Sequence, residues 1–107
     1  MSPIVILSGA RTPIGRLQGA ISTQDATSLG SIAIKAALDK ANLSGDQVDF
    51  AYMGNVISAG IGQVPARRAA TDAGIPLTVP STLLNRACLS GMLSLIHISE
   101  PTRPLYI

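Results

Sequence analysis

Short apolar segments rich in β-branched residues alternate along this chain with alanine-rich segments of helical periodicity. Residues 3–7, 48–54 and 77–87 are the strand-like segments. Residues 27–41 and 65–73 lie between them and repeat apolar side chains at the spacing of an α-helix. The order strand, helix, strand, helix, strand favours an α/β fold with largely parallel strands and right-handed crossovers. A chain of 107 residues holds one domain at most, or part of one.

Local signals support the two helices. Asp25 or Thr27 can cap the first helix, whose two apolar stripes predict that neighbouring layers cover more than half of its circumference. Gly30 would permit a close helix crossing. Pro65 suits the first turn of the second helix, and Gly74 suits its end.

The composition excludes several classes of protein. The net charge is +2 and aromatic residues make up 3% of the chain, which argues against a nucleic-acid partner. We interpret the adjacent Arg67 and Arg68 as a solvated or subunit-facing edge. A single cysteine excludes an internal disulfide framework and a multi-cysteine zinc site, so we expect a reducing, cytoplasmic location. The sequence shows neither a membrane-spanning apolar run nor a secretory signal, so we expect no membrane partner.

Two glycine-containing segments resemble nucleotide-binding motifs only superficially. Five residues separate Gly9 from Gly15, and Leu17 stands where a phosphate loop needs a metal-binding hydroxyl group. Residues 60–62 read Gly-Ile-Gly, but Pro65 occupies the third glycine position of a dinucleotide fingerprint. We therefore reject both motifs, and we interpret residues 8–26 as a long binding or interface loop.

The last strand-like segment leads directly to the single cysteine, Cys88. Ser90 and Gly91 follow as a corner of small residues at which a helix could begin. A thiol near a helix N-terminus ionises more readily and can act as a nucleophile. A lone cysteine among apolar residues is more commonly an inert part of a core. The local pattern leaves both interpretations of Cys88 open.

Three ordered motifs resemble the N-terminal part of thiolases, the acetyl-CoA acetyltransferases and 3-ketoacyl-CoA thiolases. They are V-I-L-S-G-A-R-T-P-I-G-R at residues 5–16, G-N-V-I-S-A-G-I-G-Q-V-P-A-R-R-A-A at residues 54–70 and N-R-A-C-L-S-G-M at residues 85–92. The resemblance implies the incomplete N-terminal half of the layered α/β thiolase fold. It implies that Cys88 carries the acyl group and that its backbone N–H helps to hold an oxyanion. It also implies acyl-CoA substrates, no permanently bound cofactor, and a homodimeric or homotetrameric parent protein.

The resemblance ends just after the cysteine. We expect residues 1–92 to be an N-terminal thiolase domain fragment and residues 93–107 to be a non-native tail, because the tail resembles translated sequencing-adapter read-through. In the family the activating histidine and a second cysteine come from a distant C-terminal segment, so we reject His97 as the catalytic base and expect this chain to be inactive. The alternative function is a non-catalytic α/β binding or interaction module in which Cys88 is a buried core residue.

Overall fold

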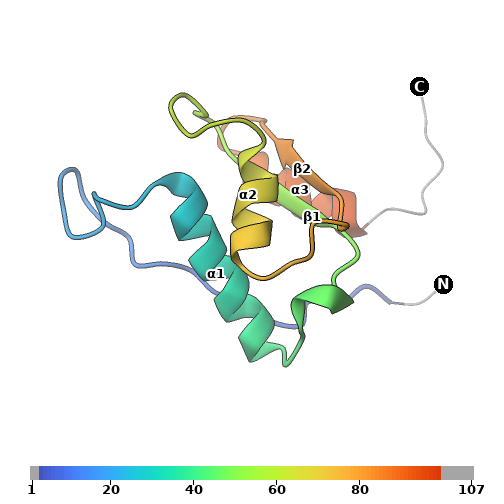
Figure 1. Ribbon diagram of the computed structural model, residues 1–107. Coiled ribbons are helices and arrows are strands. Elements are labelled where there is room, and N and C mark those ends of the chain that lie inside the picture. Colours follow the sequence, from blue (N-terminus) through green and yellow to red (C-terminus); the bar gives the residue numbers. More distant parts are fainter. Residues whose placement is uncertain (1–2, 100–107) are drawn as a thin grey trace, which may run out of the picture.

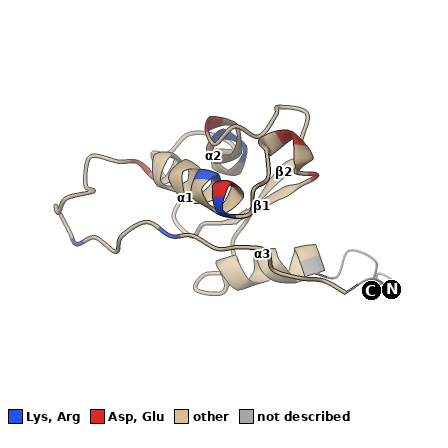
Figure 2. Cartoon of the chain, turned by 90° about the horizontal axis from the view of Figure 1, so that it is seen from below, with Lys and Arg blue, Asp and Glu red and all other residues tan. Residues whose placement is uncertain are grey.

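The computed structural model describes residues 3–99 of the chain. The elements follow the order α1 (Ala26–Lys40), the short 3₁₀ helix η1 (Gly45–Gln47), β1 (Ala51–Gly54), α2 (Pro65–Asp72), β2 (Ser81–Leu84) and α3 (Ser90–Ser99). The two strands pair in parallel, with Ala51 opposite Ser81 and Gly54 opposite Leu84. Helices α1 and α2 lie on one side of the strands and α3 lies on the other (Figures 1 and 2). The predicted α/β class and parallel pairing are confirmed.

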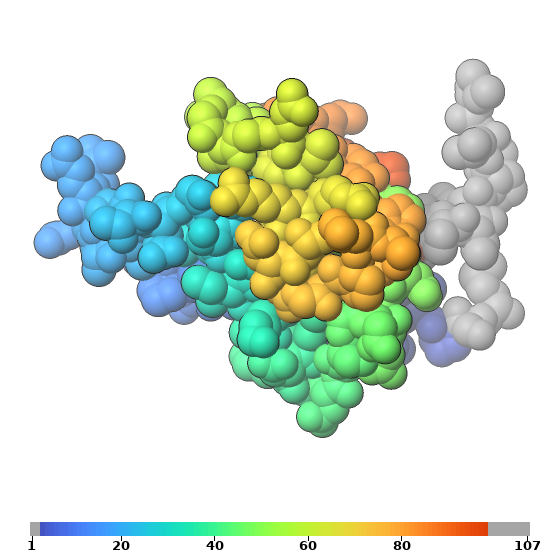
Figure 3. Space-filling model, in the orientation of Figure 1, coloured from blue at the N-terminus to red at the C-terminus, as the bar shows by residue number. Residues whose placement is uncertain are grey.

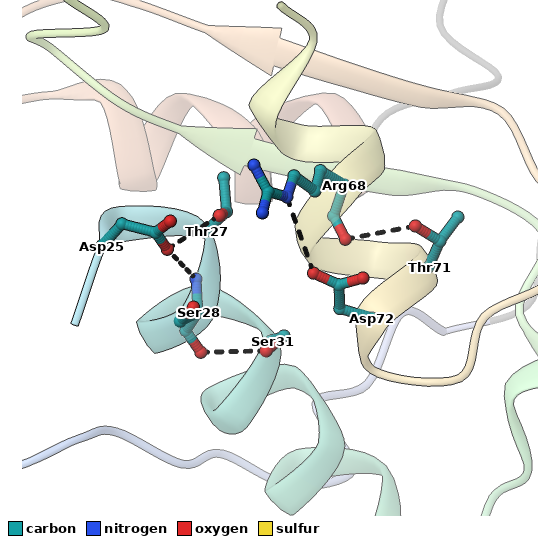
Figure 4. Close-up of polar contacts among 7 residues, drawn as sticks. All are labelled: Asp25, Thr27, Ser28, Ser31, Arg68, Thr71 and Asp72. Atoms are coloured by element: carbon teal, nitrogen blue, oxygen red, sulfur yellow. Dashed lines mark hydrogen bonds and ion pairs between the residues drawn. The ribbon is translucent and has the colours of Figure 1, made fainter. Parts of the chain in front are cut away.

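The start of α1 is capped as the sequence predicted. The Asp25 carboxylate accepts hydrogen bonds from the Ser28 backbone N–H at 2.8 Å and from the Thr27 hydroxyl at 2.9 Å (Figure 4). These bonds favour the charged carboxylate and lower the pKa of Asp25, with the Ser28 backbone bond as the largest cause and attraction by Arg68 as a minor one. On α2, Arg68 also lies 3.8 Å from Asp72, one helical turn away.

Small side chains allow α1 and α2 to pack closely. A Cβ atom built on Gly30 would lie 3.3 Å from the Ala69 Cβ, which confirms the predicted close approach. Pro65 begins α2, and Gly74 follows it with a φ of +99°. The buried hydrophobic residues are Ala66, Ala69, Ala70, Ala73, Ile75 and Val79. The core therefore lies between α1, α2, the segment that follows α2, and the sheet.

Two sequence predictions about coverage are wrong. Residues 3–7 do not form a strand, and the side chains of Ile4, Val5, Ile6 and Leu7 are between 59% and 82% exposed. A strand exists only where a neighbour pairs with its backbone. Here this segment instead borders grooves lined by α1 and α3. Helix α1 is also less covered than predicted, because Thr27 is its one buried residue among those described and Ile32 is 54% exposed.

The remaining segments are irregular. The connection before α1 contains turns and no regular helix or strand between residues 8 and 24. It projects from the body of the molecule, with Ile14 and Leu17 at least 90% exposed (Figures 1 and 3).

Within residues 3–99, no helix has the length and apolar character needed to cross a membrane. The same part of the chain holds no cluster of three His, Cys, Asp or Glu residues that could bind a metal ion.

Candidate functional site

Cys88 lies on the turn that joins β2 to α3. Its side chain is exposed, and α3 begins two residues later at Ser90, as the Ser-Gly corner predicted. The N–H groups of Leu89 and Ser90 donate to the carbonyl oxygens of Arg86 and Ala87 at 3.0 and 3.1 Å. The interpretation of Cys88 as a buried core residue is therefore wrong for this chain.

The turn contains one backbone conformation that is uncommon for its residue type. Ala87, immediately before Cys88, has a φ of +49°. A residue with a Cβ atom adopts this left-handed region at an energetic cost, and it persists only where surrounding contacts hold it. The direction in which Cys88 leaves the strand depends on this conformation.

Ser90 holds the turn from inside. It is 4% exposed, and its hydroxyl accepts from the Arg86 N–H at 2.9 Å while donating to the Ala87 carbonyl at 2.7 Å. One side chain thus links the residues on both sides of the Arg86–Ala87 peptide. Replacing it would leave the Arg86 N–H to find another partner.

Asn85 holds the turn from the opposite side. Its side-chain oxygen accepts from the Ala87 N–H at 3.0 Å, and its side-chain nitrogen donates to the Val56 carbonyl at 2.9 Å. The first bond is local and the second joins residues 29 positions apart. Asn85 therefore connects the Cys88 turn to the loop that follows β1.

Glycine at the end of β1 sets the position of α3. A Cβ atom on Gly54 would lie 2.5 Å from the Ser90 carbonyl carbon and 2.7 Å from the Gly91 nitrogen. Real Cβ atoms do not approach backbone atoms so closely, so only glycine lets the start of α3 rest on β1. The helix that follows Cys88 is therefore seated directly against the sheet.

Cys88 borders an open groove of about 430 Å³. The groove is lined by Gly54, Asn55, Val56, Ile57, Ala87, Cys88, Ser90 and Gly91. Its walls come from two places, the loop after β1 and the turn before α3. A smaller cavity of about 110 Å³ shares Gly54 and Asn55 with it and extends toward the starts of α1 and α2. An exposed thiol beside such a groove can meet an electrophile that the groove holds.

The other residues considered in the sequence lie outside this groove. His97 is on α3 and stacks on Tyr52 with ring centroids 5.7 Å apart. His97 lies seven residues after Ser90, which begins α3, and so roughly 10 Å further along the helix axis. Arg67 donates to the Leu77 carbonyl at 2.6 Å, so it ties α2 to the segment before β2 while remaining exposed. Gly60 and Gly62 have positive φ angles, in a loop that precedes α2.

The sequence analysis placed Asn85 in a motif without assigning it a role, and it treated Ser90 only as part of the corner at which a helix begins. A signal for Asn85 was present, because asparagine side chains commonly bond the backbone two residues further on. The bond from Asn85 to Val56 had no local signal, since it depends on the pairing of β1 with β2. Ser90 could equally have been an exposed helix-start residue, and only the structure shows that it is buried.

The fold agrees with comparisons to known proteins. The sequence model of the family "Thiolase, N-terminal domain" matches residues 4–101. The chain is 51% identical over 100 residues to the mitochondrial acetyl-CoA acetyltransferase of Xenopus tropicalis, covering 94% of this chain and 24% of that protein. It is 45% identical over 100 residues to the mitochondrial acetyl-CoA acetyltransferase of Homo sapiens, covering 94% of this chain and 23% of that protein.

A solved structure gives the same result. The crystal structure of the Acat5 thiolase from Ascaris suum in complex with coenzyme A superposes with a TM-score of 0.86 and 32% sequence identity, over 89% of this chain and 25% of that one. The chain therefore has part of a layered α/β fold, with its cysteine at a strand-to-helix turn. The chain belongs to the thiolase family and represents part of its N-terminal domain. It spans about a quarter of the length of the relatives it matches.

Proposed function

We propose that the protein containing this domain transfers acyl groups between coenzyme A thioesters, through a covalent thioester on Cys88. The observation that carries this proposal is the exposure of Cys88 at the strand-to-helix turn, beside the 430 Å³ groove, in a chain of the thiolase family. The relatives' names and the coenzyme A complex of the Ascaris suum thiolase support acyl-CoA as the substrate class.

The chemistry divides one difficult reaction into two steps. The Cys88 thiolate attacks the carbonyl carbon of an acyl-CoA, a new C–S bond forms, and the coenzyme A thiolate leaves. A second acyl-CoA, deprotonated at its α-carbon, then attacks the acyl group on Cys88. A 3-ketoacyl-CoA is released and the Cys88 thiolate is restored; thiolysis is the reverse sequence.

The turn offers electrostatic help for the first step. Helix α3 begins at Ser90, and the partial positive charge of a helix N-terminus favours an anion nearby. A backbone N–H at this turn, that of Cys88 in the family resemblance, would stabilise the negative oxygen that develops on the attacked carbonyl. The proton transfers need further groups, which the resemblance assigns to a histidine and a second cysteine outside these residues.

The proposal has four further parts: three follow from the family resemblance, and the location follows from the cysteine content. The 107-residue chain by itself does not turn over, because the proton-transfer groups are missing from it. The parent enzyme is a homodimer or homotetramer and needs no permanently bound cofactor. It works in the cytoplasm, as the single unpaired cysteine suggests, although the vertebrate relatives are named as mitochondrial.

Acetylation of Cys88 is the direct test. The full-length enzyme that carries residues 1–92 is mixed with acetyl-CoA, quenched in acid and digested, and the peptide containing Cys88 is examined by mass spectrometry. We expect acetyl groups on Cys88, and we expect none after Cys88→Ser, which also abolishes condensation. A Cys88→Ser enzyme that still condensed acetyl-CoA at the normal rate would refute the proposal and leave the non-catalytic module as the better interpretation.

We also propose that native sequence ends near Met92 and that residues 93–107 are foreign. The family model extends across part of this segment, to residue 101, and α3 continues to Ser99. The coding DNA decides the matter. We expect the codons after Met92 to match an adapter oligonucleotide, whereas a continuous genomic reading frame encoding residues 93–107 would contradict the proposal.

A further inference from the structure

One side chain connects the two walls of the groove beside Cys88. The strand ladder ends where the Asn55 N–H donates to the Leu84 carbonyl at 3.0 Å. Beyond that bond the chains diverge, with Val56 and Ile57 forming one wall of the groove and Ala87 and Cys88 forming the other. The Asn85 amide bridges this divergence, because it bonds the Val56 carbonyl at 2.9 Å and the Ala87 N–H at 3.0 Å.

The roles of Ser90 and Asn85 are physically different. Both bonds of the Ser90 hydroxyl remain within the turn, to Arg86 and Ala87, so Ser90 sets the shape of the turn. Asn85 bonds a different group of Ala87, the backbone N–H, and also bonds the Val56 carbonyl on the opposite wall, so it sets where the turn lies relative to Val56. Asn85 is exposed, whereas Ser90 is 4% exposed. A substitution at Asn85 therefore leaves the core intact.

The need for such a link follows from the backbone. Ala87 is held at a φ of +49°, and Cys88 follows it directly. A strained residue relaxes when its partners are removed. Without the bond to Val56, the turn would be free to move away from the wall that faces Cys88.

We propose that Asn85 is a positioning residue, whose side-chain amide fixes the spacing between Cys88 and the Val56 wall and so orients a bound thioester for attack. The inference rests on the function proposed above. Asn85 itself touches no reacting atom in this scheme. It acts through the Ala87 N–H and the Val56 carbonyl. Both are backbone groups, so a substitution at Asn85 does not change them chemically.

The discriminating variant is Asn85→Ser in the full-length enzyme. A serine hydroxyl can still bond the Ala87 N–H locally, but it is too short to reach the Val56 carbonyl, and it adds no charge. Asn85→Ala removes both contacts. Asn42→Ser is the matched control, because Asn42 lies on the exposed turn after α1 and outside the groove.

Two rate constants are measured for each enzyme: acetylation of Cys88 by saturating acetyl-CoA in a single turnover, and alkylation of Cys88 by iodoacetamide across a pH series. We expect Asn85→Ser to slow acetylation roughly tenfold or more, because a small misplacement of reacting atoms is costly. Alkylation by the small reagent should change less than about threefold with an unshifted pH profile, since it needs no orientation by the groove. Asn85→Ala should be at least as slow, and Asn42→Ser should match the unmodified enzyme.

The possible results separate the inference from the function on which it rests. If the unmodified enzyme is not acetylated, the proposed function fails and this inference fails with it. If it is acetylated and Asn85→Ser acetylates at the same rate, only the positioning role is overturned. If acetylation and alkylation fall by the same factor, Asn85 merely supports the structure, and the positioning role is again overturned.

Discussion

The α2 region and the N-terminal segment both contain apolar residues but differ in how well those residues are covered. In and after α2, Ala69 and Ala70 are each 2% exposed and Ile75 is 5% exposed. In residues 3–7, Ile6 is 82% exposed although its neighbours are equally apolar. The α2 region finds its partners in α1 and the sheet, which are close along the chain. Among the described residues no strand pairs with the N-terminal segment, which only borders open grooves beside α1 and α3.

This contrast shows that helices and strands differ in how many of their contacts must come from other parts of the chain. A helix makes its own backbone hydrogen bonds, so it needs a neighbour only for its apolar face. A strand needs a neighbour for its backbone as well. The Cys88 turn lies between these cases, because side chains of Asn85 and Ser90 supply the contacts that a longer sheet would otherwise give.

The largest expected effect is at the contact between β1 and α3. Gly54→Ala would place a Cβ atom 2.5 Å from the Ser90 carbonyl carbon, so the helix must move. We expect a loss of about 3 kcal/mol in the free energy of unfolding and a large loss of Cys88 acetylation in the full-length enzyme. Urea denaturation followed by circular dichroism measures the first. Gly9→Ala is the control, since its Cβ meets nothing within 4 Å; equal stability of the two variants would contradict the packing described here.

A smaller effect is expected inside the well-covered region. Ala69→Leu overfills the contact with α1, where a Gly30 Cβ would already lie 3.3 Å from the Ala69 Cβ. We expect a loss of about 2 kcal/mol in the free energy of unfolding. Ala20→Leu makes the same change in the exposed loop and should be nearly neutral. If both variants unfolded at the same urea concentration, the contrast between covered and uncovered regions would be wrong.

The smallest expected effect is the pH dependence of the α1 cap. The folded-state pKa of Asp25 lies below the ordinary value of 3.8, so its stabilisation is present above that value and is lost as the pH falls through the folded pKa. We expect the helical circular dichroism signal to fall as the pH is lowered through and below 3.8. In Asp25→Asn this component should be absent, because the amide still accepts from Ser28 but does not titrate. Asp39→Asn, in the last turn of α1, should retain the acid-dependent loss.

Local chemistry accounts for what the sequence predicted well. Asp25, Pro65 and Gly74 each act within a few residues of their own position, and both helices begin or end beside them as expected. The place of Cys88 before α3 was predicted from Ser90 and Gly91 in the same way. The fold class followed from the alternation of segment types.

Long-range contacts account for what the sequence could not show. Residues 3–7 have the composition of a strand, but composition does not supply a pairing partner. The bond between Asn85 and Val56 can form only when β1 and β2 are adjacent, so the local sequence does not predict it. The apolar stripes of α1 indicated which positions could be covered, and could not indicate that α2 and the sheet cover only part of them.

The bond from Arg67 to the Leu77 carbonyl and the bond from Asn85 to the Val56 carbonyl both bear on how β2 is aligned with β1. Strand β2 has only four residues, and a short parallel pair carries few ladder bonds with which to define its alignment. A slip of one residue would invert every side chain of β2 between the two faces of the sheet. Arg67 bonds the Leu77 carbonyl, four residues before β2 begins at Ser81. Asn85, the residue after Leu84, bonds the Val56 carbonyl in the loop after β1. The two side-chain bonds lie near the two ends of β2, where they favour the observed register and with it the position of Cys88 beside the groove.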